Sequence, residues 1–193
     1  MKNAIIITAL ILVVAGCTNQ QTQTQDNSVE KPQTMDGKVL IDEYSDFKCS
    51  YCARAAPTVH QIMDEYEGVV EVRFKHFPLA FHRGADKAAQ AAECARDQGM
   101  FWEYHDSLFA KLKNGVDTGT DKAMTDTAAE LGLDMQAFNP CLSSGEKKQI
   151  VDDHIEEGKR LGVTGTPTFF VDGQKIVGAQ SYKVFKQIIE SKR

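Results

Sequence analysis

The hydrophobic pattern begins with an apolar run near the start of the chain. Residues 4–15 are uncharged and mostly apolar, and Lys2 precedes them. Twelve residues are too few for a membrane-spanning helix, which needs about 20, but the length and basic start are typical of a signal-peptide core. The sequence therefore predicts a targeting segment over residues 1–16.

A polar stretch follows, and then one long region of mixed pattern. Residues 18–36 hold no aromatic residue and a single Val, and are rich in Gln, Thr and Asn. Such a segment buries too little apolar surface to order itself. We therefore expect a disordered tether over residues 17–36 and a single domain over residues 37–193.

The domain begins with a strand-like run, Val39–Tyr44. Residues 50–67 then carry apolar side chains at helical spacing, and residues 69–74 again look like a strand. A strand, a helix and a strand in this order predict a βαβ unit with parallel strands and a right-handed crossover.

Helical patterns dominate the middle of the domain. We expect five helices there, over residues 85–95, 101–112, 122–131, 135–142 and 145–160. The end of the chain returns to strands: Thr168–Val171 is a strand, Asp172-Gly173 a hairpin turn, and 175–177 the returning strand. A last helix is expected over residues 181–190, with Ser181 as its cap. The elements predict an α/β fold.

Composition and charge narrow the function only slightly. The 193 residues are 42% hydrophobic and 25% charged, which excludes a disordered or fibrous chain. The net charge is −5, and no dense block of basic residues is present. Nucleic acid is therefore not an expected partner.

The clearest chemical signal is the motif Cys49-Ser50-Tyr51-Cys52, placed where the first strand gives way to the first helix. A CxxC pair in this context indicates thiol redox chemistry. Unpaired N–H groups and the helix dipole should lower the pKa of Cys49 below the free value of about 8.5, and Lys48 adds a positive charge nearby. We expect Cys49 to be the nucleophile and the more buried Cys52 to be the resolving thiol.

Three other uses of a CxxC motif fit less well. A structural zinc site usually has a second CxxC or a His pair, a c-type haem site needs His where Ala53 stands, and a CxxC disulfide closes too small a loop to stabilise much. Neither a metal nor a cofactor is therefore expected.

The residues Val14-Ala15-Gly16-Cys17 resemble the lipobox of bacterial lipoproteins, in which cleavage precedes an acylated Cys. The alternative is an ordinary secretory signal with an incidental Cys. The resemblance implies lipidation at Cys17, an anchor in a membrane, and a location in the cell envelope outside the cytoplasm, where disulfides persist.

Three further segments, residues 39–52 (VLIDEYSDFKCSYC), 74–79 (FKHFPL) and 165–172 (GTPTFFVD), resemble the DsbA-like branch of the thioredoxin superfamily. The resemblance covers residues 38–193. It implies a thioredoxin fold with an inserted helical domain at about residues 80–161.

The resemblance also implies roles for single residues. Pro167 falls on the family's cis-proline, which presents backbone to an extended substrate, and Thr166 and Tyr51 join it as expected substrate-binding residues. Glu43 falls on the buried acid that exchanges a proton with Cys52. The alternatives are a trans proline at the start of a strand and a carboxylate on an edge strand.

The implied activity is a protein-disulfide oxidoreductase that introduces disulfides into exported, cysteine-containing proteins, is reset by a membrane redox partner and acts as a monomer. Two departures leave the direction open. The dipeptide Ser50-Tyr51 lacks the His of strongly oxidising members, and Thr166 resembles reductase and isomerase members, although isomerases carry a dimerisation domain where this chain has the tether. A non-catalytic, peptide-binding lipoprotein is a third hypothesis.

Two cysteines remain after Cys17 and the CxxC pair are assigned. Cys94 and Cys141 both fall in the helical region, and four cysteines allow three pairings. Pairing within the CxxC motif leaves a structural Cys94–Cys141 bridge, with two buried free thiols as the alternative.

Other conspicuous side chains have simpler interpretations. His76, His82 and His105 are expected on loops or helix surfaces, without a catalytic role. Trp102 and its aromatic neighbours are expected in the core of the helical region.

Overall fold

The computed structural model describes residues 37–193; the predicted signal peptide, Cys17 and the predicted tether lie outside the described residues. In chain order the elements are β1 (Val39–Ser45), α1 (Ser50–Glu65), β2 (Val70–His76), α2 (Ala85–Arg96), α3 (Phe101–Lys113), α4 (Asp121–Glu130), α5 (Met135–Ser144), α6 (Lys148–Arg160), β3 (Thr168–Val171), β4 (Gln174–Val177) and α7 (Tyr182–Glu190). Among these residues, no helix is long and apolar enough to cross a membrane.

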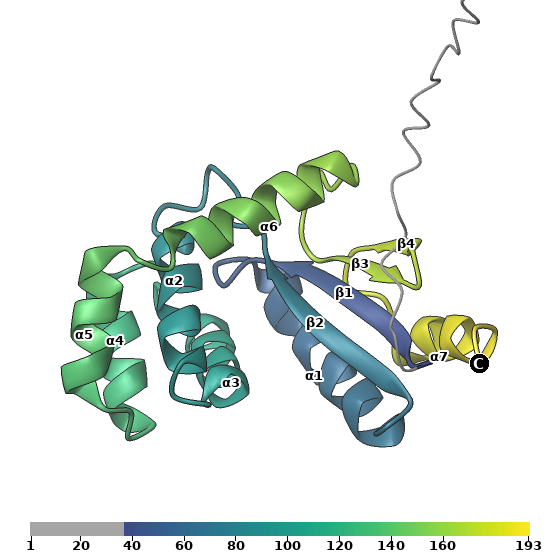
Figure 1. The fold of residues 1–193 in the computed structure, drawn as a ribbon, viewed down its shortest axis with the longest axis horizontal. Coiled ribbons are helices and arrows are strands. Elements are labelled where there is room, and N and C mark those ends of the chain that lie inside the picture. The colour runs from purple at the N-terminus through teal and green to yellow at the C-terminus, as the bar shows by residue number, and fades with distance from the viewer. Residues whose placement is uncertain (1–36) are drawn as a thin grey trace, which may run out of the picture. The chain divides into compact units, whose positions relative to one another are not determined.

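The four strands form one sheet in the order β2-β1-β3-β4 (Figure 1). β1 pairs with β2 in parallel, as the βαβ pattern predicted, and with β3 antiparallel. Every residue of β1 is buried, because this strand is central and both faces of the sheet are covered. Glu43 lies in the middle of β1, opposite Phe74 of β2 and Phe169 of β3.

Helices cover the two faces of the sheet, and the alternation along β1 decides which side chains meet which helix. Val39 and Ile41 pack with Val59 of α1 and Phe185 of α7, so Glu43 and Ser45, which continue that alternation, share the face that α1 covers. On the other face, Tyr44 packs in a cluster to which Ile155 of α6 adds. In Figure 1, α1 and α6 lie on opposite sides of the sheet.

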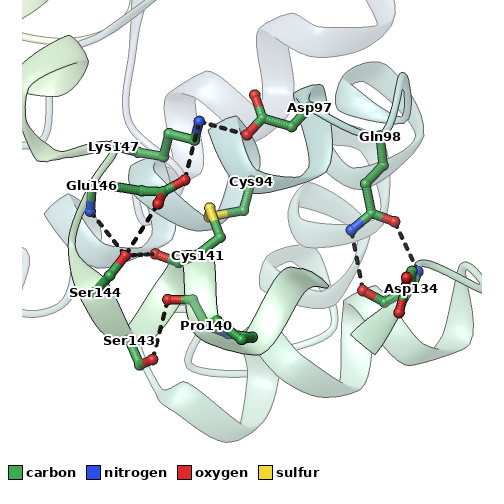
Figure 2. Close-up of a disulfide and its surroundings, with 10 residues drawn as sticks. All are labelled: Cys94, Asp97, Gln98, Asp134, Pro140, Cys141, Ser143, Ser144, Glu146 and Lys147. Atoms are coloured by element: carbon green, nitrogen blue, oxygen red, sulfur yellow. Dashed lines mark hydrogen bonds and ion pairs between the residues drawn. A yellow bond between two sulfur atoms is a disulfide. The ribbon is translucent and has the colours of Figure 1, made fainter. Parts of the chain in front are cut away.

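The helices α2 to α6 lie between β2 and β3 in the chain, and α2 to α5 gather beside the sheet (Figure 1). Their shared core includes Leu108, Met124 and Phe138, and the alanine-rich α2 is buried along almost its whole length. A disulfide joins Cys94 of α2 to Cys141 of α5 (Figure 2). The predicted α/β class, a thioredoxin fold with an inserted helical domain, is confirmed.

Some boundaries differ from the prediction. The fifth helix of the insert begins at Lys148 instead of Gly145, because Gly145 ends α5 in the left-handed region with φ 71°. Ser181 is the N-cap residue of α7, as predicted, but its side chain makes no capping hydrogen bond.

Candidate active site

Cys49 occupies the N-cap position of α1. Its backbone is extended, with φ −87° and ψ 115°, its N–H donates to the Asp46 carbonyl at 2.9 Å, and its carbonyl accepts from Ala53 N at 3.1 Å. The sulfur is therefore held at the helix end where backbone N–H groups have no partner within the helix. The predicted placement of Cys49 at the start of this helix is confirmed.

The two sulfurs of the motif differ strongly in environment. Both are free thiols; Cys49 is 6% exposed and Cys52 is fully buried. Hydrogen bonding from the Cys52 thiol, the nearby Thr166 side chain and the backbone N–H groups of Cys52 and Tyr51 together lower the pKa of Cys49 from 9.0 to about 5, against the opposing effect of burial; the Thr166 hydroxyl has no partner at hydrogen-bond distance among the described residues. Burial, together with the Cys49 sulfur, raises the pKa of Cys52 well above its usual value. Thus Cys49 ionises first, as a nucleophile must.

The loop before β3 lies against the CxxC motif. The Cys49 Sγ is 3.4 Å from the Thr166 carbonyl oxygen, and the Thr166–Pro167 peptide bond is cis. The Pro167 carbonyl accepts from Gly178 N at 2.8 Å, whereas within residues 37–193 the Thr166 N–H has no hydrogen-bond partner. The backbone group of this turn that remains without a partner is therefore the Thr166 N–H, because the Pro167 carbonyl is already bonded.

Tyr51 lies on the rim of the site. Its side chain is 57% exposed, and the Arg54 guanidinium lies 4.3 Å above its ring. The first turn of α1 thus carries an exposed aromatic side chain two residues after Cys49.

Glu43 is a fully buried acid on the central strand and not on an edge strand. Burial raises its pKa to about 7, partly opposed by the Ser45 hydroxyl. In the described part of the chain, neither carboxyl oxygen has a partner at hydrogen-bond distance. Ser45, which the sequence analysis missed, also lowers the pKa of Cys52. Within the described residues its Oγ, like both carboxyl oxygens of Glu43, is buried without a hydrogen-bond partner.

The positive charge expected from Lys48 is directed elsewhere. Its Nζ donates to the Arg83 carbonyl at 2.8 Å and pairs with Asp117 at 2.8 Å. This ammonium group fastens the loop before α1 to the start of the insert. The low pKa of Cys49 comes from its hydrogen-bond donors and not from Lys48, so that part of the sequence interpretation was wrong.

Asp46 is a second residue that the sequence analysis missed. Its buried carboxylate accepts from Lys48 N at 2.7 Å, Leu79 N at 2.8 Å and His82 Nδ1 at 2.7 Å. The contact with Lys48 is a local turn that such a residue often forms. The other two donors come from the loop after β2, more than 30 residues away, and no sequence pattern reveals them. Asp46 thereby fixes the backbone on which Cys49 sits.

Two of the three histidines expected at the surface are fully buried. His76 contacts Glu93 at 2.6 Å, and His105 contacts Asp106 at 2.8 Å. Burial lowers the pKa of both imidazoles, so they are neutral and, with a carboxylate partner, can be accommodated in the interior. The surface prediction was wrong for these two; His82 does lie in a loop and is partly exposed.

Together, the N-terminal thiol, the buried second thiol and the adjacent Thr166–Pro167 turn form a site suited to thiol–disulfide exchange. The family model described as Thioredoxin matches residues 34–191. The chain belongs to the thioredoxin family.

Curated relatives carry a related domain within much longer proteins. A protein named Na(+)/H(+) antiporter NhaA 1 from Salinispora arenicola is 34% identical over 154 residues, which are 79% of this chain and 23% of that protein. The NhaA antiporter of Herminiimonas arsenicoxydans is 30% identical over 158 residues, which are 82% of this chain and 24% of that protein. The chain spans less than a quarter of the length of these relatives.

Solved structures of similar fold include a thioredoxin-like oxidoreductase from Silicibacter pomeroyi, with 25% identity, a TM-score of 0.70, and 81% of this chain and 87% of that chain covered. BdbD from Bacillus subtilis has 24% identity, a TM-score of 0.70 and coverage of 82% and 89%. The thiol-disulfide exchange protein alpha-DsbA2 from Wolbachia pipientis has 20% identity, a TM-score of 0.70 and coverage of 85% and 88%. The fold is that of DsbA-like thiol–disulfide oxidoreductases.

Proposed function

We propose that the chain is an extracytoplasmic, membrane-tethered protein-disulfide oxidoreductase that introduces disulfides into exported proteins through Cys49 and Cys52. The observation that carries this proposal is the contrast between the two thiols. The pKa of Cys49 is about 5, and that of the fully buried Cys52 is well above its usual value. A stable Cys49 thiolate is a good leaving group, and a good leaving group makes the disulfide oxidising.

The proposed cycle begins with the oxidised protein. A substrate thiolate attacks Cys49 Sγ, the Cys49–Cys52 bond breaks, and its electron pair leaves on Cys52 Sγ, which takes up a proton. A second substrate thiolate then attacks the substrate sulfur of the mixed disulfide and expels the Cys49 thiolate. The substrate loses two electrons and gains a disulfide, and the CxxC pair gains two electrons. A membrane redox partner must remove them before the next cycle.

Glu43 is the proposed source of the proton for Cys52. A pKa of about 7 lets a carboxyl group both hold and release a proton at neutral pH. It shares the α1-facing side of β1 with Ser45, whose hydroxyl lowers the pKa of both Glu43 and Cys52. In the proposed transfer the proton passes through this hydroxyl, which has no hydrogen-bond partner within the described residues.

The proposed substrate-binding surface consists of Thr166, Pro167 and Tyr51. The Thr166 N–H, which has no partner within residues 37–193, can donate to the backbone of an extended substrate. Tyr51 offers an exposed ring next to the reacting sulfur. Recognition through backbone suits an enzyme that accepts many sequences.

The proposed location rests on the sequence and on relatives. The lipobox-like residues before Cys17 support a lipid anchor, and residues 17–36 would tether the domain to the membrane. A periplasmic thioredoxin-like protein from Salmonella enterica has this fold, with a TM-score of 0.68 and 20% identity. Exported proteins with pairs of cysteines are the proposed substrates, and the protein is proposed to act as a monomer.

The proposal is tested by trapping the mixed disulfide. Oxidised protein is mixed with a reduced, two-cysteine peptide, and peptide oxidation is followed by mass spectrometry. We expect Cys49→Ser to abolish oxidation. Cys52→Ser cannot form the internal disulfide, so the reduced variant is mixed instead with the disulfide form of the peptide; its Cys49 thiolate attacks that disulfide, and a peptide-linked intermediate at Cys49 should accumulate because no Cys52 thiol displaces it. A peptide adduct on Cys52 in Cys49→Ser that forms at least as fast, or rapid alkylation of Cys52 alone at pH 6 in the native protein, would reverse the assignment of the two thiols.

A reductase or isomerase is the second candidate, favoured by Thr166 beside the sulfur and by the absence of a histidine between the two cysteines. The equilibrium redox potential of the CxxC pair separates the two directions, because a potential near that of thioredoxin, about −270 mV, indicates a reductase. A non-catalytic binding module would show no fast-reacting thiol when the reduced protein is alkylated.

A further inference from the structure

Three side chains with metal-binding atoms meet where the helix that carries the CxxC motif packs on the insert. His60 of α1 contacts Asp106 of α3 at 2.7 Å (Nε2 to Oδ1), and His105 contacts the same oxygen at 2.8 Å (Nδ1 to Oδ1). One ligand atom from each residue lies within 4.8 Å of the others. His60 and Asp106 are 46 residues apart, so sequence spacing does not reveal this group.

The group combines one fixed ligand with two adjustable ones. His105 is fully buried, and the rings of Phe74 and Phe109 lie nearly perpendicular to its imidazole at 5.2 and 4.7 Å. The side chains of His60 and Asp106 are 34% and 48% exposed. A solvent molecule can therefore reach the side of the group that faces outward.

The carboxylate at the centre of the group has one oxygen that is not engaged. Within the described residues, Asp106 Oδ2 has no hydrogen bond, so this carboxylate has a free oxygen for a further bond.

We propose that His60, His105 and Asp106 form a binding site for a divalent transition-metal ion, with Zn²⁺ the best match to two imidazoles and a carboxylate. Water would fill the fourth position of a tetrahedron. Zn–ligand bonds of about 2.0–2.1 Å place tetrahedral ligand atoms about 3.3 Å apart, so the group must open by roughly half an ångström. The exposed side chains of His60 and Asp106 can make this movement.

The site is separate from the thiol chemistry. His60 lies eight residues after Cys52 on the same helix, which is about 12 Å along its axis, and the proposal does not depend on the proposed function. By joining α1 to α3, the ion would fasten the thioredoxin core to the insert. It would stabilise the folded chain by mass action.

A second group, Asp97, Cys141 and Glu146, has similarly close atoms but is committed elsewhere. The Cys141 sulfur is bonded to Cys94, and both carboxylates pair with Lys147 (Figure 2). A sulfur in a disulfide is not a thiolate ligand, and one ammonium group already pairs with both carboxylates. This second group therefore serves as an internal comparison.

The test is calorimetric titration of the oxidised protein, without an affinity tag, with Zn²⁺. Oxidation removes the Cys49 and Cys52 thiols as competing ligands. We expect one ion per chain, and His60→Ala and Asp106→Asn should each weaken binding about tenfold or more. Asp64→Asn, an exposed residue on the same helix, and Asp97→Asn, in the second group, should leave the affinity unchanged.

Fluorescence gives an independent measurement. Trp102 is the only tryptophan of the chain and lies 5.9 Å from the His60 ring and 5.1 Å from the His105 ring. Cu²⁺ should quench its emission saturably in the native protein and in Asp64→Asn, and Zn²⁺ should reverse the quenching. Absence of saturable binding at millimolar Zn²⁺, or the same affinity in His60→Ala and Asp106→Asn as in the native protein, overturns the proposal.

Discussion

Oxidation of the CxxC pair should change the stability of the protein in a way that depends on pH. In the reduced, folded protein the pKa of Cys49 is about 5, against 9.0 for an unperturbed thiol. At pH 7 the folded state holds a thiolate and the unfolded state a thiol, and the two units between 7 and 9 correspond to about 3 kcal/mol in favour of the reduced fold. The disulfide form has no thiolate and lacks this contribution.

The sign follows from the lowered pKa. The contribution is complete above about pH 9, falls to about 3 kcal/mol at pH 7, and vanishes as the pH falls through about 5. The disulfide acts in the opposite direction to the thiolate. Because it closes a loop of four residues in the unfolded chain, it favours the oxidised fold by about 2 kcal/mol in the chain-entropy model. The reduced protein should therefore be the more stable form at pH 7 and the less stable form at pH 5.

Urea unfolding of the two forms at both pH values measures the effect, with the bridge between Cys94 and Cys141 left intact in every sample. The reduced-minus-oxidised difference in the free energy of unfolding should rise by about 2 kcal/mol from pH 5 to pH 7, or about 4–8 °C in Tm. Titration of Glu43 occurs in both forms and largely cancels. Cys49→Ser forms neither the thiolate nor the disulfide. Its free energy of unfolding should therefore depend on pH in the same way as that of the oxidised form. A difference that stays constant with pH refutes the reasoning.

Three further predictions concern single side chains. Cys52→Ala removes the main donor to the Cys49 sulfur, so the midpoint of Cys49 alkylation against pH should rise from about 5; an unchanged midpoint assigns the effect to the helix backbone and Thr166 alone. Glu43→Gln removes a carboxyl group whose pKa burial raises to about 7, so it should stabilise the fold at pH 7 by about 3 kcal/mol in urea unfolding but not at pH 4; equal effects at both pH values contradict the raised pKa. Replacing Cys94 and Cys141 with Ala should destabilise by about 4 kcal/mol for a sequence separation of 47 while peptide oxidation continues, and loss of oxidation in a folded variant would show that the bridge is not merely structural.

Local patterns were enough to place the reactive thiols. Cys49 and Cys52 lie where a strand pattern meets a helix pattern, and helix geometry then decides which sulfur is near the surface. The position of Glu43 followed from the family resemblance, and the central place of its strand became visible only when the sheet order was known. Periodicity does not encode sheet order.

Long-range pairing was beyond prediction. His76 looked polar enough for the surface, but Glu93, 17 residues further along the chain, contacts its ring inside the fold. Likewise, Lys48 is close to Cys49 in sequence and yet bonds across to the insert. Such partners are chosen by packing of distant segments, so a side chain's polarity alone does not determine its burial.

In the proposed cycle, the deep burial of Cys52 also affects how long a substrate stays linked to Cys49. Once a substrate is linked to Cys49 in this cycle, Cys52 is the one other free thiol within residues 37–193, and its attack on the mixed disulfide, which releases the substrate unoxidised, has the high effective concentration of an intramolecular reaction. Because burial is the main reason that its pKa is raised, this thiol stays protonated and attacks slowly. The abortive route is thereby delayed, and the substrate's second cysteine has time to find its partner. The burial of Cys52 thus lengthens the lifetime of the mixed disulfide at Cys49, and the proposed oxidation of the substrate depends on that lifetime.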